Sequence, residues 1–406
     1  MRNPCRVLFG LFFAALALCA SCRRSGVVAS VGEERLFALK YGSFEDELDL
    51  FSLSRAGAVR TYMAMRDGFF YIANGEARKI MELNSYGDLL TLYYNDEAGG
   101  APSFASDNAE NATRKAVAYP FSTLGPIAVD GRKYLYAVDT LPPERHETDE
   151  KERLALRSVV LRFAADGSFV DYLGQQGPGG TPFPFVRALY ATAANELVAV
   201  CVTNGGFAVY WFGEDGFLRY SVPVTAAAVP NPYKEGAEDA VYVSVENVVP
   251  DLLAHRLYLK VDYFANTLDP ALKVQSGVEY QHTLLYPLDL DTGRYDAPLE
   301  IPAYEDTVSE GLGTESRQLP YDFLGVTESG WFFFSVPTER GFAVQMVQPN
   351  GQRILRRTLG VNHGDILYYA MHLDEEGILS ALFVKRDEAE VDWWRTDSLI
   401  DAFLKN

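Results

Sequence analysis

Histidine is the side chain best suited to metal binding and to proton transfer near neutral pH. The chain contains five of them: His146, His255, His282, His363 and His372. None stands at the short spacing from another histidine or a cysteine that zinc sites use. A Gly-x-Ser-x-Gly elbow, a Walker loop and a paired-carboxylate motif are also missing from the sequence. The residue types and their spacing therefore predict no catalytic site.

Cysteine offers a second kind of chemistry, because its sulfur can carry a lipid. Arg2 and Arg6 precede an apolar run over residues 7–20, which is too short for a comfortable membrane span and typical of a signal peptide. The sequence Leu-Cys-Ala-Ser-Cys at residues 18–22 resembles a lipobox, in which small residues precede an acylated cysteine. We therefore expect a lipoprotein signal peptide over residues 1–21, a lipid on Cys22 and a tether over residues 22–33. The alternative is an ordinary secretory signal that is cleaved near Ser21.

Lipidation would leave Cys201 as the single cysteine available in the mature chain, within an apolar run where a buried, unreactive thiol is expected. The formal net charge of −19 becomes −21 once Arg2 and Arg6 are removed. A surface of this charge repels nucleic acid and anionic lipid headgroups, so no nucleic-acid partner is expected. Membrane attachment must then come from the acyl chains. We expect an exported protein that is lipid-anchored to a bacterial cell membrane.

The elements that carry these residues are short runs of β-branched and aromatic residues, and no segment of any length has a helical period. A strand, a tight Gly turn and a second strand recur five times, as tight hairpins with positive φ require. The turn glycines are Gly87, Gly167, Gly216, Gly293 and Gly351. An apolar strand precedes each of these hairpins, and another short run precedes that strand. This repeat predicts four-stranded blades.

A sixth repeat over residues 366–395 has only three strands, whereas the apolar run over residues 35–41 has no partner beside the first repeat. Exchange of this N-terminal strand into the last blade would close a ring and cover its open edge. The sequence therefore predicts one all-β domain over residues 34–406. Its expected fold is a six-bladed β-propeller with the N-terminal strand closing the last blade.

Two segments resemble NHL-type six-bladed propellers of the kind found in spirochaete cell envelopes: Ile-Ala-Val-Asp at 127–130 with Tyr-Leu-Tyr-Ala-Val-Asp at 134–139, and Phe-Tyr-Ile-Ala-Asn at 70–74. The resemblance implies an envelope lipoprotein whose propeller binds proteins or other ligands, with no cofactor. Related lactonase-type propellers imply the alternative, a calcium-dependent hydrolase or small-ligand binder that uses the central channel. The candidate calcium ligands would be Asp130, Asp139, Asn204, Asn247 and Asp262. Their other interpretation is as turn residues that cap backbone N–H groups.

Envelope proteins are the expected partners, and long insertions on a rigid scaffold are the expected contact surfaces. Three insertions are predicted, over residues 97–118, 142–153 and 263–278. The second contains the weak interaction candidates His146, Glu147 and Asp149. Adjacent Trp393 and Trp394 would project to opposite faces of a strand, so one of them is either a docking residue or covered by a further layer.

Overall fold

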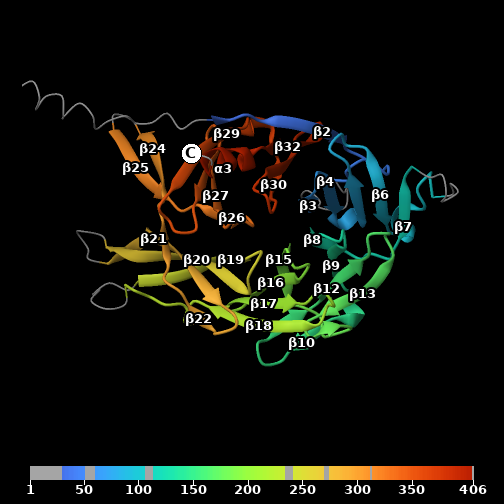
Figure 1. The fold of residues 1–406 in the computed structure, drawn as a ribbon, viewed down its shortest axis with the longest axis horizontal. Helices are drawn as coiled ribbons and strands as arrows, with labels where there is room; N and C mark the ends of the chain where they lie inside the picture. Colours follow the sequence, from blue (N-terminus) through green and yellow to red (C-terminus); the bar gives the residue numbers. More distant parts are fainter. Residues whose placement is uncertain are drawn as a thin grey trace, which may run out of the picture.

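The computed structural model describes residues 30–50, 60–105, 113–233, 241–268, 274–310 and 313–404. Over these residues, six small sheets stand side by side in a ring (Figure 1). Each sheet is a blade, and its first strand lies innermost. The chain is a six-bladed β-propeller, as predicted. Residues 1–29, including Cys22, lie outside the described residues, so the structure does not test the signal peptide or the lipid.

The first three blades follow one another along the chain. Blade 1 contains β3 (Thr61–Arg66), β4 (Phe69–Asn74), β5 (Lys79–Leu83), β6 (Leu89–Tyr94) and β7 (Lys115–Ala118). Blade 2 contains β8 (Leu124–Val129), β9 (Leu135–Thr140), β12 (Ser158–Phe163), β13 (Phe169–Gly174) and β14 (Gly177–Pro178). Blade 3 contains β15 (Phe185–Ala191), β16 (Leu197–Thr203), β17 (Gly206–Phe212) and β18 (Leu218–Thr225).

The last three blades include the two that the N-terminal segment joins. Blade 4 contains β19 (Val241–Pro250), β20 (Arg256–Leu268), β21 (Gln275–Asp289), β22 (Arg294–Tyr295) and β23 (Leu299–Ile301). Blade 5 contains β26 (Asp322–Val326), β27 (Phe332–Thr338), β28 (Gly341–Val347), β29 (Ile354–Gly360) and β1 (Ser30–Val31). Blade 6 contains β30 (Tyr368–Leu373), β31 (Leu379–Val384), β32 (Glu388–Trp394) and β2 (Glu34–Lys40).

The N-terminal segment closes the ring at two places. β2 pairs antiparallel with β32 as the fourth strand of blade 6, which confirms the predicted strand exchange. Figure 1 shows β2, in blue, along the outer edge of the ring beside β29 and β32. β1, within the segment expected to be a tether, adds a second link by pairing parallel with β29.

Each blade is covered on both faces by its neighbours, and hydrophobic side chains pack in the interfaces between them. The described residues form six apolar clusters, one at each interface between adjacent blades. Phe37 of the closing strand β2 packs edge-on against Phe70 of blade 1, with ring centroids 5.5 Å apart. Trp331 and the three phenylalanines after it are all buried between blades. Cys201 is buried and unpaired, as expected.

The turn glycines were predicted correctly. All five have φ between +66° and +87°, a range that a side chain makes unfavourable. In blade 1, a Cβ on Gly87 would also stand 2.8 Å from Cβ of Phe37. The turn that closes this hairpin therefore also leaves room for the N-terminal strand.

The predicted insertions have structure of their own. The first begins with α2 (Asp96–Gly99) and ends in β7. The second contains the short helix η2 (Pro143–Arg145) and a hairpin of β10 (Glu147–Asp149) with β11 (Leu154–Leu156). The third is an extension of blade 4, because β20 and β21 are 13 and 15 residues long. Shorter helices are η1 (Gly75–Ala77) and η3 (His363–Asp365).

The sequence predicted repeated strands and no helical segment, but the structure contains two further elements. A hairpin of β24 (Tyr304–Glu310) and β25 (Gly313–Leu319) stands between blades 4 and 5. The helix α3 (Thr396–Leu404) follows β32, and its Ile400 packs with Trp394 in the cluster between blades 5 and 6. A helical layer therefore covers Trp394, which is fully buried, whereas Trp393 is half-buried and donates a hydrogen bond to Glu34. No helix among the described residues is long and apolar enough to cross a membrane.

Candidate functional site

The described residues form several hollows, of which two lie at the centre of the ring and beside blades 4 and 5. The first is the central channel, a cavity of about 280 Å³ lined by residues from the innermost strands of all six blades. The second is a groove of about 530 Å³ beside blades 4 and 5, lined by β21, β23, β24, β28 and β29.

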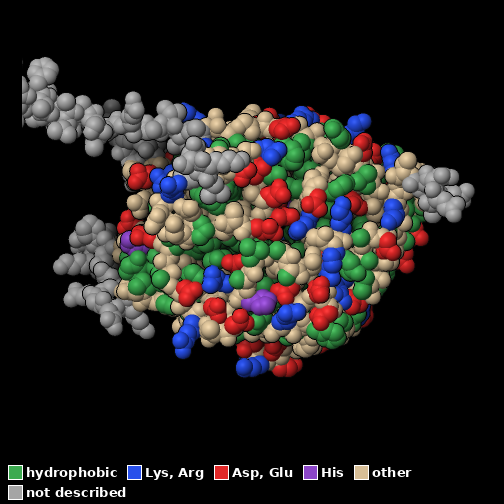
Figure 2. Space-filling view, viewed as in Figure 1, with side chains coloured by type: hydrophobic (Ala, Val, Ile, Leu, Met, Phe, Trp, Pro, Cys, Tyr) green, Lys and Arg blue, Asp and Glu red, His purple; other side chains and the backbone are tan. Residues whose placement is uncertain are grey.

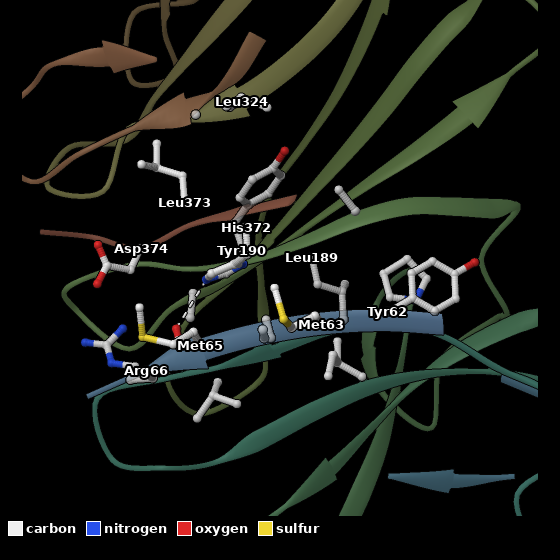
Figure 3. Close-up of a pocket in the computed structure, with 18 of the residues that line it drawn as sticks. Tyr62, Met63, Met65, Arg66, Leu189, Tyr190, Leu324, His372, Leu373 and Asp374 are labelled. Atoms are coloured by element: carbon white, nitrogen blue, oxygen red, sulfur yellow. Dashed lines mark hydrogen bonds between the residues drawn. The ribbon is translucent and has the colours of Figure 1, made fainter. Parts of the chain in front are cut away.

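The middle of the channel is largely apolar, with Met63, Met65 and Leu189 beside His372 (Figure 3). The ring of His372 hydrogen-bonds to the carbonyl oxygen of Met65 at 3.2 Å, so its Nε2 carries the proton that it donates. Burial and, to a smaller extent, the nearby Arg66 cation lower the pKa of His372 to about 4, although the hydrogen bond to Met65 opposes this. His372 is therefore neutral at physiological pH.

Charged residues gather at one end of the channel, where the innermost strands turn into the second strands. Figure 3 shows Arg66 and Asp374 at this end and Tyr62 at the other. Arg66 pairs with Glu375 at 3.1 Å. Asp374 accepts hydrogen bonds from the backbone N–H groups of Glu376, Gly377 and Ile378. In the space-filling view, acidic and basic side chains lie close together over the centre of the ring (Figure 2).

Two acidic groups at this mouth, Asp374 and Glu375, have raised pKa values because they are buried. Burial raises the pKa of Asp374 to about 7, although the hydrogen bonds from Ile378 and Gly377 oppose this rise. Burial also raises the pKa of Glu375. Nε of Arg66 is buried without a partner among the described residues, as is Oδ1 of Asn195 in the turn after β15. The mouth can therefore accept an anionic or hydrogen-bonding group at Arg66.

The structure does not bring the calcium candidates together. Asp130 is fully buried at the end of β8, where it pairs with Arg132 at 2.8 Å and accepts bonds from Tyr136 and two backbone N–H groups. Asp139, in the same blade, accepts bonds from the N–H groups of Ser122 and Thr123, and burial raises its pKa to about 6. Both aspartates act as the turn and loop caps that were the other interpretation of these residues.

The remaining candidates lie in blades 3 and 4. Asn204 is exposed and donates to the carbonyl oxygen of Glu152, while Asn247 donates to that of Phe323. Asp262 is buried between Lys260, at 2.6 Å, and Thr283. Across the described ranges, no group of three or more acidic, histidine or cysteine side chains is arranged to hold a metal ion.

The groove beside blade 4 is built from elements that interrupt the repeat. Behind its lining, Arg356 donates to the buried amide of Gln345, and Gln345 donates to the carbonyl oxygen of Pro302. On the blade 4 side, His282 stacks on Tyr233 and lies 3.5 Å from Glu300. The groove thus combines aromatic, amide and charged groups.

One wall of the groove is an incomplete sheet edge. β23 pairs with β21 only at residues 283–285, and the chain reaches Pro302 directly afterwards. Proline has no N–H to donate, so β23 cannot continue along β21. Within the described part of the chain, residues 275–282 of β21 therefore pair only with β20. Sequence reasoning missed this edge, because an insertion of polar residues gives no sign of which strand it leaves uncovered.

The predicted interaction residues lie elsewhere on the surface. His146 and Glu147 are exposed on the hairpin insertion of blade 2, and His146 donates to the carbonyl oxygen of Leu141. Asp149 accepts from the N–H groups of Lys151 and Glu152, which shapes the β10–β11 turn. His146 and Glu147 border a shallow hollow of about 420 Å³.

No protein-family model and no curated protein matches the chain. Among solved structures, the chain is similar to a gluconolactonase from Xanthomonas campestris, with 12% identity and a TM-score of 0.39 over 92% of this chain and 99% of that one. It is also similar to an ulvan lyase of the polysaccharide lyase family PL25, with 9% identity and a TM-score of 0.38 over 91% and 95%. A third is the propeller domain of the Trilobed protease from Pyrococcus furiosus, with 8% identity and a TM-score of 0.37 over 82% and 95%. Similarity at this level assigns no activity to the chain.

Proposed function

We propose that the protein is a lipid-anchored interaction module of a bacterial cell envelope, in which the propeller binds an envelope protein and carries out no reaction. The anchor is the lipid on Cys22 that the sequence predicts. The observation that supports binding is the groove beside blade 4, where residues 275–282 of β21 have no second strand partner in the described part of the chain. Such an incomplete sheet edge recognises an extended segment of another protein through main-chain hydrogen bonds.

The channel gives less support for a catalytic function than the groove gives for protein binding. His372, Asp374 and Glu375 are each already bonded to a group of the protein itself. A general base needs to reach the proton that it removes, and these groups would first have to give up their partners.

Anchoring is tested by the substitution Cys22→Ala in cells that produce the protein. The variant should leave the membrane fraction, whereas Cys201→Ala, at a buried thiol, should not. Retention of Cys22→Ala in membranes would contradict the proposed anchor.

Binding is tested by placing a photo-crosslinking amino acid at Gln281, which is exposed on β21, and at Phe217, which is exposed in the β17–β18 turn. A discrete crosslinked species should form from position 281 and not from position 217. Crosslinking from a third position, Thr148 on β10, instead of Gln281 would assign the contact to the blade 2 hairpin.

A second candidate function is suggested by the unpartnered Nε of Arg66. The channel would then bind a small anionic ligand. The calcium-dependent hydrolase implied by the lactonase resemblance is the other form of this alternative, and Arg66 gives it no support. Calcium should raise the melting temperature of the protein in this case, and a chelator should reverse the effect. Equal melting temperatures with calcium and with chelator, together with no shift by small carboxylates, would exclude this alternative.

A further inference from the structure

The outer edge of blade 5 carries a group of arginines in an otherwise strongly acidic protein. Arg353, just before β29, and Arg356, within β29, are exposed. Arg357, also within β29, is partly exposed. We call these three residues the blade 5 arginines. Arg356 bonds to the neutral amide of Gln345, and Arg357 bonds to the carbonyl oxygen of Arg356. Within the described ranges, neither of these two has a carboxylate within ion-pair distance, although Glu300 and Glu305 line the same groove from β23 and β24.

The same edge is where the N-terminal segment joins the ring. Ser30 pairs with Thr358 and Val31 with Leu359, so the first described residue lies directly beside the blade 5 arginines. Cys22 lies eight residues before Ser30 in the sequence. A chain of that length spans at most about 28 Å when fully extended. A lipid on Cys22 would therefore hold this edge near the membrane surface, with blade 2 on the other side of the ring.

We infer that the blade 5 arginines contact anionic phospholipid headgroups and fix the propeller edge-on to the membrane. This inference rests on the proposed lipid anchor. A guanidinium matches the geometry of a phosphate group, and each arginine near an anionic bilayer adds to binding. The net charge of the whole protein would repel such a bilayer, so the contact needs the tether to bring this one edge close. The partner groove, which Arg356 and Arg357 also line, then opens near the membrane.

The test uses the unlipidated mature chain, residues 22–406, coupled through Cys22 to a maleimide lipid in vesicles, because Cys201 is buried. Modification of arginines by phenylglyoxal is followed residue by residue with mass spectrometry. The blade 5 arginines should react about fivefold more slowly on phosphatidylcholine vesicles that contain phosphatidylglycerol than on phosphatidylcholine alone. Arg153, exposed on the blade 2 insertion, should react at the same rate on both.

A matched pair of variants distinguishes a local contact from general charge. Replacing Arg356 and Arg357 with Gln should abolish the protection of Arg353, whereas replacing Lys151 and Arg153 with Gln should leave it intact. Equal rates on both kinds of vesicle would overturn the inference. Protection by inorganic phosphate without vesicles would also overturn it, because the arginines would then serve a soluble anion.

Failure of this test is separable from failure of the anchor. In the vesicle test, chemical coupling replaces the natural lipid. If the arginines were not protected there, the fractionation result for Cys22→Ala in cells would still support the anchor. A native Cys22 without acyl chains would remove the anchor and this inference together.

Discussion

Polar residues at the ends of second strands hold the blades to their neighbouring loops. Asn74 at the end of β4 exchanges two hydrogen bonds with the backbone of Asp49, and Asp139 at the end of β9 accepts from two backbone N–H groups before β8. The two positions are equivalent in the sequence repeat, which resembles the NHL pattern. Asp139, one of the calcium candidates, is thus used here to satisfy buried backbone donors.

Asp130 gives a direct test of this structural role. The variant Asp130→Ala leaves the Arg132 charge without its buried partner and two backbone N–H groups without an acceptor. We expect unfolding in urea to show a loss of about 2–4 kcal/mol. The loss should be the same with calcium as with chelator, and a stabilisation by calcium that disappears in this variant would instead identify a metal ligand.

Asp392 is buried in a way that costs stability. Its side chain is almost fully enclosed, and neither carboxylate oxygen has a hydrogen-bond donor among the described residues. Burial raises its pKa well above the usual range, and a carboxyl hydrogen bond with Glu33, made in the protonated form, and the negative charges of Glu33 and Glu390 act in the same direction. Between the unfolded pKa near 4 and the folded pKa, the folded chain holds a proton that the unfolded chain has released. This group therefore lowers the free energy of unfolding as the pH rises through that range.

The substitution Asp392→Asn removes this titration. We expect the variant to be more stable than the natural chain by about 1–3 kcal/mol at pH 8 and similar to it at pH 4. Urea unfolding at the two pH values measures the difference, with Asp387→Asn in the exposed turn before β32 as the matched control. A gain that is equal at both pH values would mean that ionisation of Asp392 is not its cause.

At the scale of elements, the closing strand could be predicted because its apolar pattern had no partner where it stands in the sequence. The two-residue strand β1 could not, because so short a segment carries no pattern. α3 is only nine residues long, and it was missed for a similar reason. The choice that the sequence left open for Trp393 and Trp394 depended on this helix, since Ile400 covers one of the two rings.

The closing strand should contribute most of its stability through Phe37. Phe37→Ala removes a buried ring from the cluster between blades 6 and 1, which should cost about 3–5 kcal/mol. The change should appear in thermal unfolding and as faster amide exchange in β32. Phe44→Ala, at a ring that is 67% exposed, should change little and serves as the control. Unaltered exchange in β32 would mean that β2 is not needed to hold blade 6.

At the scale of the whole molecule, the ring and its six blades could be predicted because every blade repeats one turn geometry and one apolar pattern. The groove could not, because it depends on where Pro302 ends a strand and on a β24–β25 hairpin that is largely polar. Repetition carries information about the scaffold. The candidate contact surface lies where the blade repeat is interrupted. No equivalent segment elsewhere in the sequence can be compared with it.

Closure by β2 also imposes an order on biogenesis. The segment Glu34–Lys40 is made long before its partner β32 (Glu388–Trp394), which lies about 350 residues further along the chain. Contacts between such distant parts form late and slowly. During synthesis, the interface of blade 1 with blade 6 therefore stays incomplete until β32 has been made. The unclosed chain exposes strand edges throughout this time, which is when chaperones or proteases would act on it.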